Sequence, residues 1–125
     1  MAGVTLDAGA LIAFERNDRR MVALIARSLA HGYSLTVPAG VVGQVWRSGR
    51  RQARLARLLA ADEVEIASLD DHGAREAGQL CGVTGTSDVI DASVVLCARA
   101  RGHRIATSDP DDIRRLNPAA HVILV

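Results

Sequence analysis

The sequence contains no lysine and very few aromatic residues. All 15 of its basic residues are arginine, and Phe14, Tyr33 and Trp46 are its only aromatic residues. Because 49% of the residues are nonetheless hydrophobic, the core has to be built from Ala, Val, Leu and Ile. This composition favours helices packed on a buried sheet.

Cysteines and long hydrophobic runs are also scarce. Cys81 and Cys97 have no metal-binding spacing, so we expect two buried or half-buried thiols. The histidines lack zinc spacing too, and we expect them on the surface or in loops. No hydrophobic run is long enough for a membrane span, and the N-terminal residues show no basic leader or cleavage site. We therefore expect a cytoplasmic protein, with residues 1–125 forming one domain.

Hydrophobic periodicity and turn residues predict alternating strands and helices. The expected strands are residues 4–6, 33–37, 64–67, 104–107 and 121–125, and the expected helices are residues 8–14, 19–31, 38–49, 52–61, 70–81, 89–100 and 109–116. Residues 89–100 are hydrophobic on almost all sides, so this helix is expected at the centre. The sequence thus predicts an α/β fold of three layers, with a mostly parallel central sheet of four to five strands and helices on both faces.

Three aspartates are placed where a parallel sheet would bring them together. Asp7 follows the first strand, Asp109 follows the fourth, and Asp91 begins the central helix. Carboxylates gathered at one sheet edge repel one another, and a hard divalent cation such as Mg²⁺ or Mn²⁺ relieves that repulsion. Such a site can activate water and offset the charge of a phosphodiester. The pattern therefore predicts metal-dependent phosphodiester hydrolysis.

Helix capping is an alternative explanation for two of the acids. Asp88 and Asp91 lie three residues apart at the start of the expected helix 89–100. Ser87 or Asp88 can serve as its N-cap, and a carboxylate at position 91 is favoured by the helix dipole. Taken alone, this pair is typical of a helix N-terminus rather than of a metal site.

Three segments resemble the acidic motifs of PIN domains: VTLD at residues 4–7, DVIDAS at 88–93 and IATSDPDD at 105–112. Their order and separations agree with that family over nearly the whole chain, and the short length resembles VapC-type toxins, the ribonucleases of bacterial toxin–antitoxin pairs. The resemblance implies a PIN-like fold that cleaves RNA with Mg²⁺ or Mn²⁺, forms a homodimer and is held inactive by a VapB-type antitoxin. It also implies metal-binding and catalytic roles for Asp7, Asp91 and Asp109, a supporting carboxylate at Asp88, a peripheral one at Asp111 or Asp112, and a hydrogen bond from Ser108 to the site.

The chain departs from the family pattern at one position. The second motif of the family usually supplies a glutamate on the helix after the second strand, where this chain has Gln44. An amide oxygen can still contact a metal or its bound water, but it lacks the charge and basicity of a carboxylate. Glu15 lies two helical turns beyond Asp7 and is expected to point away. The sequence therefore also predicts an alternative, a catalytically impaired PIN-fold protein that binds RNA or antitoxin.

Five arginines recur at three- and four-residue spacing between residues 47 and 57. If one helix continues past Gly49, these side chains form a basic face. The face is either a solvated surface or a contact for RNA phosphates or the antitoxin. The candidate contact residues are Arg47, Arg50 and Arg51.

A third class of protein also clusters aspartates on an α/β fold. Receiver-like phosphotransfer domains do so, but they need a lysine at a strand end. The absence of lysine from this chain argues against that class.

Overall fold

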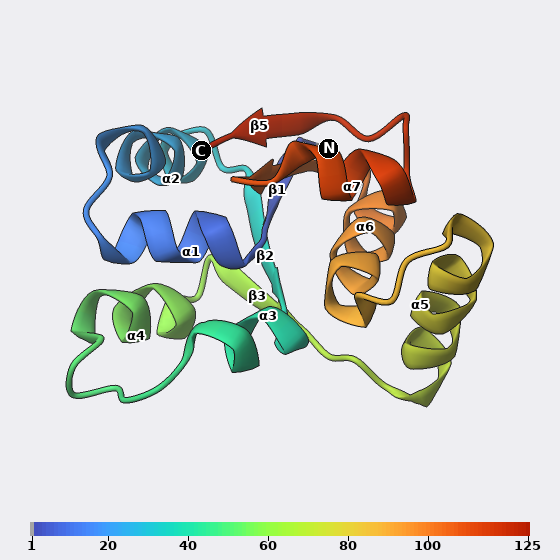
Figure 1. The fold of residues 1–125 in the computed structure, drawn as a ribbon. Coiled ribbons are helices and arrows are strands. Elements are labelled where there is room, and N and C mark those ends of the chain that lie inside the picture. The colour runs from blue at the N-terminus through green and yellow to red at the C-terminus, as the bar shows by residue number, and fades with distance from the viewer. Residues whose placement is uncertain (1) are drawn as a thin grey trace.

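A five-stranded parallel sheet forms the middle of the protein (Figure 1). The computed structural model describes residues 2–125. The strands are β1 (Gly3–Leu6), β2 (Ser34–Pro38), β3 (Val64–Ala67), β4 (Arg104–Thr107) and β5 (Val122–Leu124). Their order in the sheet is β3-β2-β1-β4-β5, and every neighbouring pair is parallel. The predicted fold class and sheet are confirmed.

Helices cover both faces of this sheet. They are α1 (Ala8–Glu15), α2 (Arg19–Ala30), α3 (Ala39–Val45), α4 (Ala53–Ala60), α5 (Asp71–Thr84), α6 (Val89–Arg101) and α7 (Pro110–Leu116). Helices α1, α2 and α4 lie on one face, α6 lies on the other, and α5 packs on the outside of α6 (Figure 1). Helix α3 contacts both α1 and α6, so it bridges the two layers beside the end of β2.

The strand order creates a switch point at β1. From β1 the chain first adds strands on the β2 side and later returns to pair β4 on the other side. In open parallel sheets, the crevice outside the carboxyl ends of the strands at such a point is the usual binding site. The two strands at this point end next to Asp7 and Ser108, which places the predicted acids beside it.

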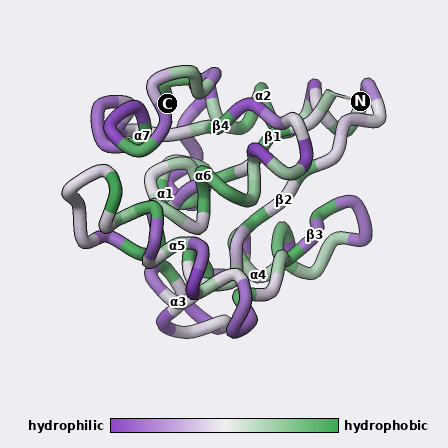
Figure 2. Tube along the Cα trace, turned by 90° about the vertical axis from the view of Figure 1, so that its right-hand side faces the viewer, coloured by the Kyte–Doolittle hydropathy of each residue, from purple (hydrophilic) through white to green (hydrophobic). Residues whose placement is uncertain are grey.

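The core explains why these segments form strands. Val4 and Leu6 of β1 are fully buried, and so are Leu35 and Val37 of β2. Strands that are buried on both faces are typical of parallel sheets enclosed by helices. The hydrophobic colour in Figure 2 accordingly follows parts of the strands, and the hydrophilic colour lies on outer loops and on helices such as α7.

Helix α6 is the central helix, as predicted. It contacts β1, β2 and β4 as well as α3, α5 and α7. Its buried residues are Ala92, Ser93, Val94, Val95 and Ala98. No single helix within residues 2–125 has the length and hydrophobicity to cross a membrane. Helices α5 and α6 have that length and hydrophobicity only when they are taken together, and the pair is bent by 108°.

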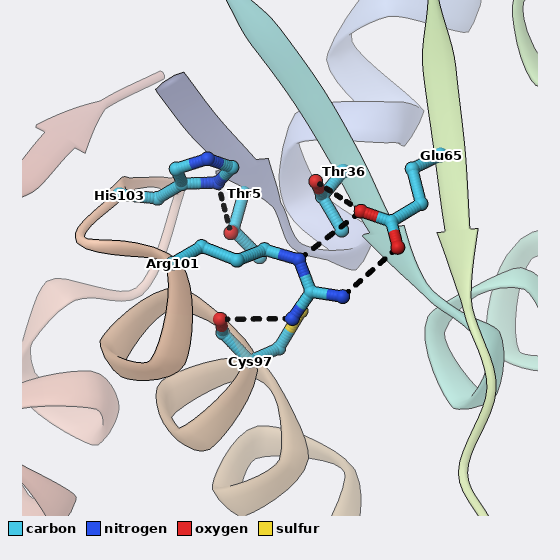
Figure 3. A network of polar contacts seen from close by, with 6 residues as sticks. All are labelled: Thr5, Thr36, Glu65, Cys97, Arg101 and His103. Carbon is cyan, nitrogen blue, oxygen red and sulfur yellow. Dashed lines mark hydrogen bonds and ion pairs between the residues drawn. The ribbon is translucent and has the colours of Figure 1, made fainter. Parts of the chain in front are cut away.

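A polar network fastens the C-terminal end of α6 to the sheet (Figure 3). Arg101 donates to both carboxylate oxygens of Glu65 on β3, at 3.1 and 3.0 Å. Thr36 on β2 donates to the same carboxylate at 3.3 Å. The hydrogen bond from Arg101 lowers the pKa of Glu65. Because this network holds one end of α6, it helps to fix the direction of the helix whose other end carries Asp91.

Two predicted helices have different ends in the structure. The helix expected over residues 70–81 continues to Thr84 and is capped by Gly85, whose φ of 72° is left-handed. Glycine is favoured at a left-handed C-cap. Gly82 lies inside the helix, where a Cβ would meet open space, so the structure does not require glycine at that position. The helix expected to run from residue 38 to Gly49 ends at Val45. One helix through residues 47–57, the condition for a continuous basic face, is therefore absent, because α3 ends at Val45 and α4 begins at Ala53.

A single buried glutamine explains why the chain leaves the helix at Val45. The Gln52 amide donates to the Val45 carbonyl at 2.8 Å and to Glu15 at 3.1 Å. Its oxygen accepts from the backbone N–H groups of Arg47 and Ser48, at 2.7 and 2.9 Å. These bonds satisfy backbone groups in the turn between α3 and α4, which stabilises that turn against a continuing helix.

We expect Gln52→Ala to lower the free energy of unfolding by about 2–3 kcal/mol, since several buried polar groups lose their partner. Urea denaturation of the variant measures this change. Gln79→Ala is the matched control, because Gln79 is exposed on α5 and its removal should change stability by less than about 0.5 kcal/mol. Equal stability of the two variants would contradict the role assigned to Gln52.

Candidate metal centre

The predicted acids meet in one pocket of about 280 Å³ beside the switch point. It is lined by residues at the starts of α1, α6 and α7 and by Gln44 of α3. Its lining includes every site residue that the sequence predicted apart from the arginines, namely Asp7, Gln44, Asp88, Asp91, Ser108 and Asp109. Residues from four separate segments of the chain thus share one cavity.

Asp7 is the most buried acid of the pocket, with 7% of its surface exposed. It is also the N-cap of α1, because its Oδ1 accepts from the Ala10 N–H at 3.0 Å. Burial raises the pKa of Asp7, and the charge of Asp109 adds to that rise. Hydrogen bonds from Thr107 and the first turn of α1 oppose the rise. This carboxylate is therefore held in place but costly to ionise without a cation.

Asp88 and Asp91 have different roles at the start of α6. Asp88 is the N-cap of α6, with its Oδ1 accepting from the Asp91 N–H at 2.9 Å, so the capping interpretation is confirmed for Asp88. Asp91 makes no such cap and is half-buried. Burial, followed by the charges of Asp88, Asp112 and Asp7, raises the pKa of Asp91 to about 6. Burial and three neighbouring carboxylates therefore distinguish Asp91 from an ordinary carboxylate at the start of a helix.

Asp109 and Asp112 form the outer rim of the pocket. Asp109 occupies the N-cap position of α7 without a side-chain cap, and its backbone N–H donates to Thr107 Oγ1 at 2.9 Å. The charge of Asp112 is the main reason that the pKa of exposed Asp109 is raised. Asp112 also lines the pocket, although the sequence indicated only a peripheral role. The three-residue spacing from Asp109 was the signal for a shared helix face.

Two glycines allow the walls of the pocket to approach each other. A Cβ on Gly9 would overlap the Ser108 hydroxyl, and a Cβ on Gly40 would overlap Ile90 on α6. The first contact brings the β4–α7 turn against α1. The second brings α3 against α6. Exposed Gln44, which is on α3, thereby lines the pocket.

The arginines and Glu15 lie outside this pocket. The Arg47 guanidinium donates to the carbonyls of Gly43 and Trp46, at 3.2 and 2.7 Å, and so covers the end of α3. Arg50 and Arg51 are exposed in the turn after α3. Glu15 is bound to Gln52, so it does not replace a carboxylate at position 44.

The donor chemistry of the pocket fits a hard divalent cation. The polar side chains that line it supply carboxylate, amide and hydroxyl oxygens, the kinds of ligand that Mg²⁺ and Mn²⁺ prefer. Burial raises the pKa values of Asp7 and Asp91, and neighbouring carboxylates add to these rises and raise the pKa of Asp109. Within residues 2–125, no three His, Cys, Asp or Glu side chains are already close enough to hold one ion. The acids surround the pocket rather than form a finished cage.

We expect Asp91→Asn to stabilise the metal-free protein at pH 7.5 by about 1 kcal/mol, a value reduced for solvent screening because Asp91 is only half-buried. Because the pKa of Asp91 is higher in the folded protein, ionisation of Asp91 costs stability. Below pH 3.8 the carboxyl is protonated in both states and the protein keeps its full stability, which then falls as the pH rises through about 6. The difference between variant and wild type should therefore vanish near pH 4. Thermal melts in EDTA at both pH values test this, and a less stable variant at pH 7.5 would favour the helix-dipole explanation.

The fold and the acid-lined pocket at its switch point are those of a PIN domain. The chain belongs to the PIN-domain family, whose sequence model matches residues 4–117. PIN domains are typically nucleases and generally use divalent metals. No curated protein sequence matches the chain.

Solved toxin–antitoxin complexes contain chains of similar fold. The chain of VapBC2 from Rickettsia felis, bound to a promoter DNA fragment, superposes with a TM-score of 0.73 at 14% identity, covering 100% of this chain and 99% of that chain. FitAcB from Neisseria gonorrhoeae gives a TM-score of 0.64 at 16% identity, with 96% of each chain covered. A toxin–antitoxin complex from Klebsiella pneumoniae gives 0.66 at 14% identity, covering 97% and 96%. At these identities the likeness shows a shared fold.

Proposed function

We propose that this protein is a metal-dependent endoribonuclease and the toxin of a VapBC-type toxin–antitoxin pair. The observation that carries the proposal is the single pocket in which Asp7, Asp91 and Asp109 meet, and in which burial and the charges of neighbouring acids raise the pKa values of Asp7 and Asp91. Membership of the PIN-domain family supports nuclease chemistry. The similarity of the fold to chains from toxin–antitoxin complexes supports the biological role.

In this proposal Asp7, Asp91 and Asp109 hold Mg²⁺ or Mn²⁺, and Asp88 adds negative charge beside them. A bound ion supplies Lewis-acid chemistry, since it lowers the pKa of water and offsets the charge of a phosphodiester. Asp7 is suited to a fixed ligand because α1 and the sheet hold it on both sides. Asp109 is suited to meet the incoming RNA because it is exposed at the rim. The Ser108 hydroxyl lies beside it and can hydrogen-bond a phosphate oxygen.

The second candidate function is an impaired PIN-fold protein that binds RNA or antitoxin without cleaving. Gln44 favours it, because this side chain lines the pocket at the place where the family usually supplies a carboxylate. The amide can orient a water molecule but cannot accept its proton at neutral pH. In either function, we propose a VapB-type antitoxin as partner, a homodimer as the assembly, and Arg47, Arg50 and Arg51 as candidate RNA or antitoxin contacts.

Cleavage of a labelled single-stranded RNA separates the two functions. We expect cleavage with Mn²⁺ or Mg²⁺ and none in EDTA, together with a higher melting temperature when metal is added, because an ion that binds only the folded state stabilises it. RNA binding without cleavage under all metal conditions would support the impaired protein. Calorimetric titration that detects no metal binding at millimolar concentration would reject the metal centre.

A further inference from the structure

A second pocket, of about 440 Å³, adjoins the metal pocket. The two share Asp88, Asp91 and Asp112, which line both. The second pocket, here called the side pocket, extends from these acids between the loop after α5 and the last turn of α7. The loop contributes Gly85, Thr86 and Ser87, and α7 contributes Arg115 and Leu116. The two pockets are thus neighbouring parts of one surface depression.

Arg115 is the only positively charged side chain among the described residues that line either pocket. None of the ion pairs within residues 2–125 involves it, although three carboxylates line the same pocket. Its neighbour Arg114 is exposed too and also belongs to the last turn of α7, but it lines neither pocket. Both arginines interact equally with the helix dipole, so the dipole does not explain the position of Arg115.

We propose that the side pocket binds the nucleotide next to the cleaved phosphodiester, and that Arg115 contacts the phosphate of that nucleotide. This inference rests on the proposed ribonuclease function. If the scissile phosphate sits at Asp7, Asp91 and Asp109, the adjoining nucleotide has to lie against a wall of the same depression. On the side-pocket wall, the acids alone would repel its phosphate, and an arginine offers a charge-assisted, bidentate contact that offsets this repulsion.

The rest of the side pocket suits a sugar and base. Its volume lies within the usual range for small-ligand sites. Leu116 supplies an apolar surface for a ring, and the Thr86 Oγ1 atom is buried without a hydrogen-bond partner. Arg115 is therefore assigned as an RNA-positioning residue rather than as a catalytic one.

The experiment compares wild type, Arg115→Ala and the matched control Arg114→Ala on one labelled single-stranded RNA. We expect Arg115→Ala to raise KM about tenfold, as the loss of one charged hydrogen-bonding contact does, with kcat changed by less than about twofold. The salt dependence of RNA binding, measured by fluorescence anisotropy in EDTA, should lose about 0.7 in slope, the contribution of one phosphate on a single strand. Arg114→Ala should change neither, and Arg115→Lys should recover part of the affinity.

Identical KM values and salt slopes for the two alanine variants would overturn the assignment. A changed kcat and a changed Mn²⁺-induced shift of the melting temperature, with RNA binding unaltered, would also overturn it, because Arg115 would then act on the acids alone. The anisotropy measurement does not require cleavage. Arg115-dependent RNA binding by a wild-type protein that fails to cleave would therefore support the side pocket and reject the nuclease function.

Discussion

Replacing Asp7 with asparagine is expected to reduce RNA cleavage about a hundredfold or more while leaving the fold intact. Asp7 is the least exposed carboxylate of the pocket, so no other acid can take its place without moving the chain. Asparagine keeps the shape and the cap on the Ala10 N–H, because Asn and Asp are equally good N-cap residues. It also removes a carboxylate whose pKa is raised by burial, so the metal-free variant should be at least as stable as wild type.

Asp70→Asn is the matched control for this prediction. Asp70 caps α5 by accepting from the Gly73 N–H at 2.8 Å, but it is exposed and lies outside the metal pocket. Cleavage assays and melts in EDTA should show two stable variants, of which only Asp7→Asn is inactive. An active Asp7→Asn protein would remove Asp7 from the site, and a strongly destabilised one would mean that its charge mainly serves the fold.

Gln44→Glu is expected to tighten Mn²⁺ binding and to raise the rate of RNA cleavage, each by about tenfold. The side chain already lines the pocket and is exposed, so the carboxylate can be introduced without a burial cost. The carboxylate is a stronger ligand for a hard cation than the amide is, and it can accept a proton from water. Without metal, the same charge should lower the melting temperature, since it joins Asp7, Asp91 and Asp109.

Gln79→Glu adds the same charge at an exposed position on α5, away from the pocket. Calorimetric titration with Mn²⁺ and cleavage of one labelled RNA by both variants make the comparison direct. Equal affinities and rates for Gln44→Glu, Gln79→Glu and wild type would show that position 44 does not belong to the metal centre.

Much of the fold could be predicted because its signals are local. Strand and helix positions follow from the hydrophobic pattern, and the edge that carries the acids follows from the common direction of parallel strands. Asp7 and Asp109 each come after a predicted strand, so their shared edge needed no knowledge of the sheet order. The order itself, in which β1 pairs with β4, depends on contacts between distant segments and was not predicted.

The errors arose where one side chain decides the path of the backbone. The helix that begins after residue 38 was expected to reach Gly49, yet it ends at Val45, where Gln52 bonds backbone groups on both sides of the turn. The spacing of hydrophobic and charged residues in a sequence does not reveal such a hydrogen bond. The same holds for Asp112 and Arg115, whose place beside the acids depends on how α7 packs against α6.

The use of Asp7 and Asp88 as helix caps has a consequence for how the protein tolerates mutation. A selection that scores only the amount of folded protein would accept asparagine or serine at both positions, because those residues also cap helices. A selection that scores RNA cleavage would reject them at position 7. Sequence drift can therefore silence the proposed enzyme in a single step and still leave a well-folded protein.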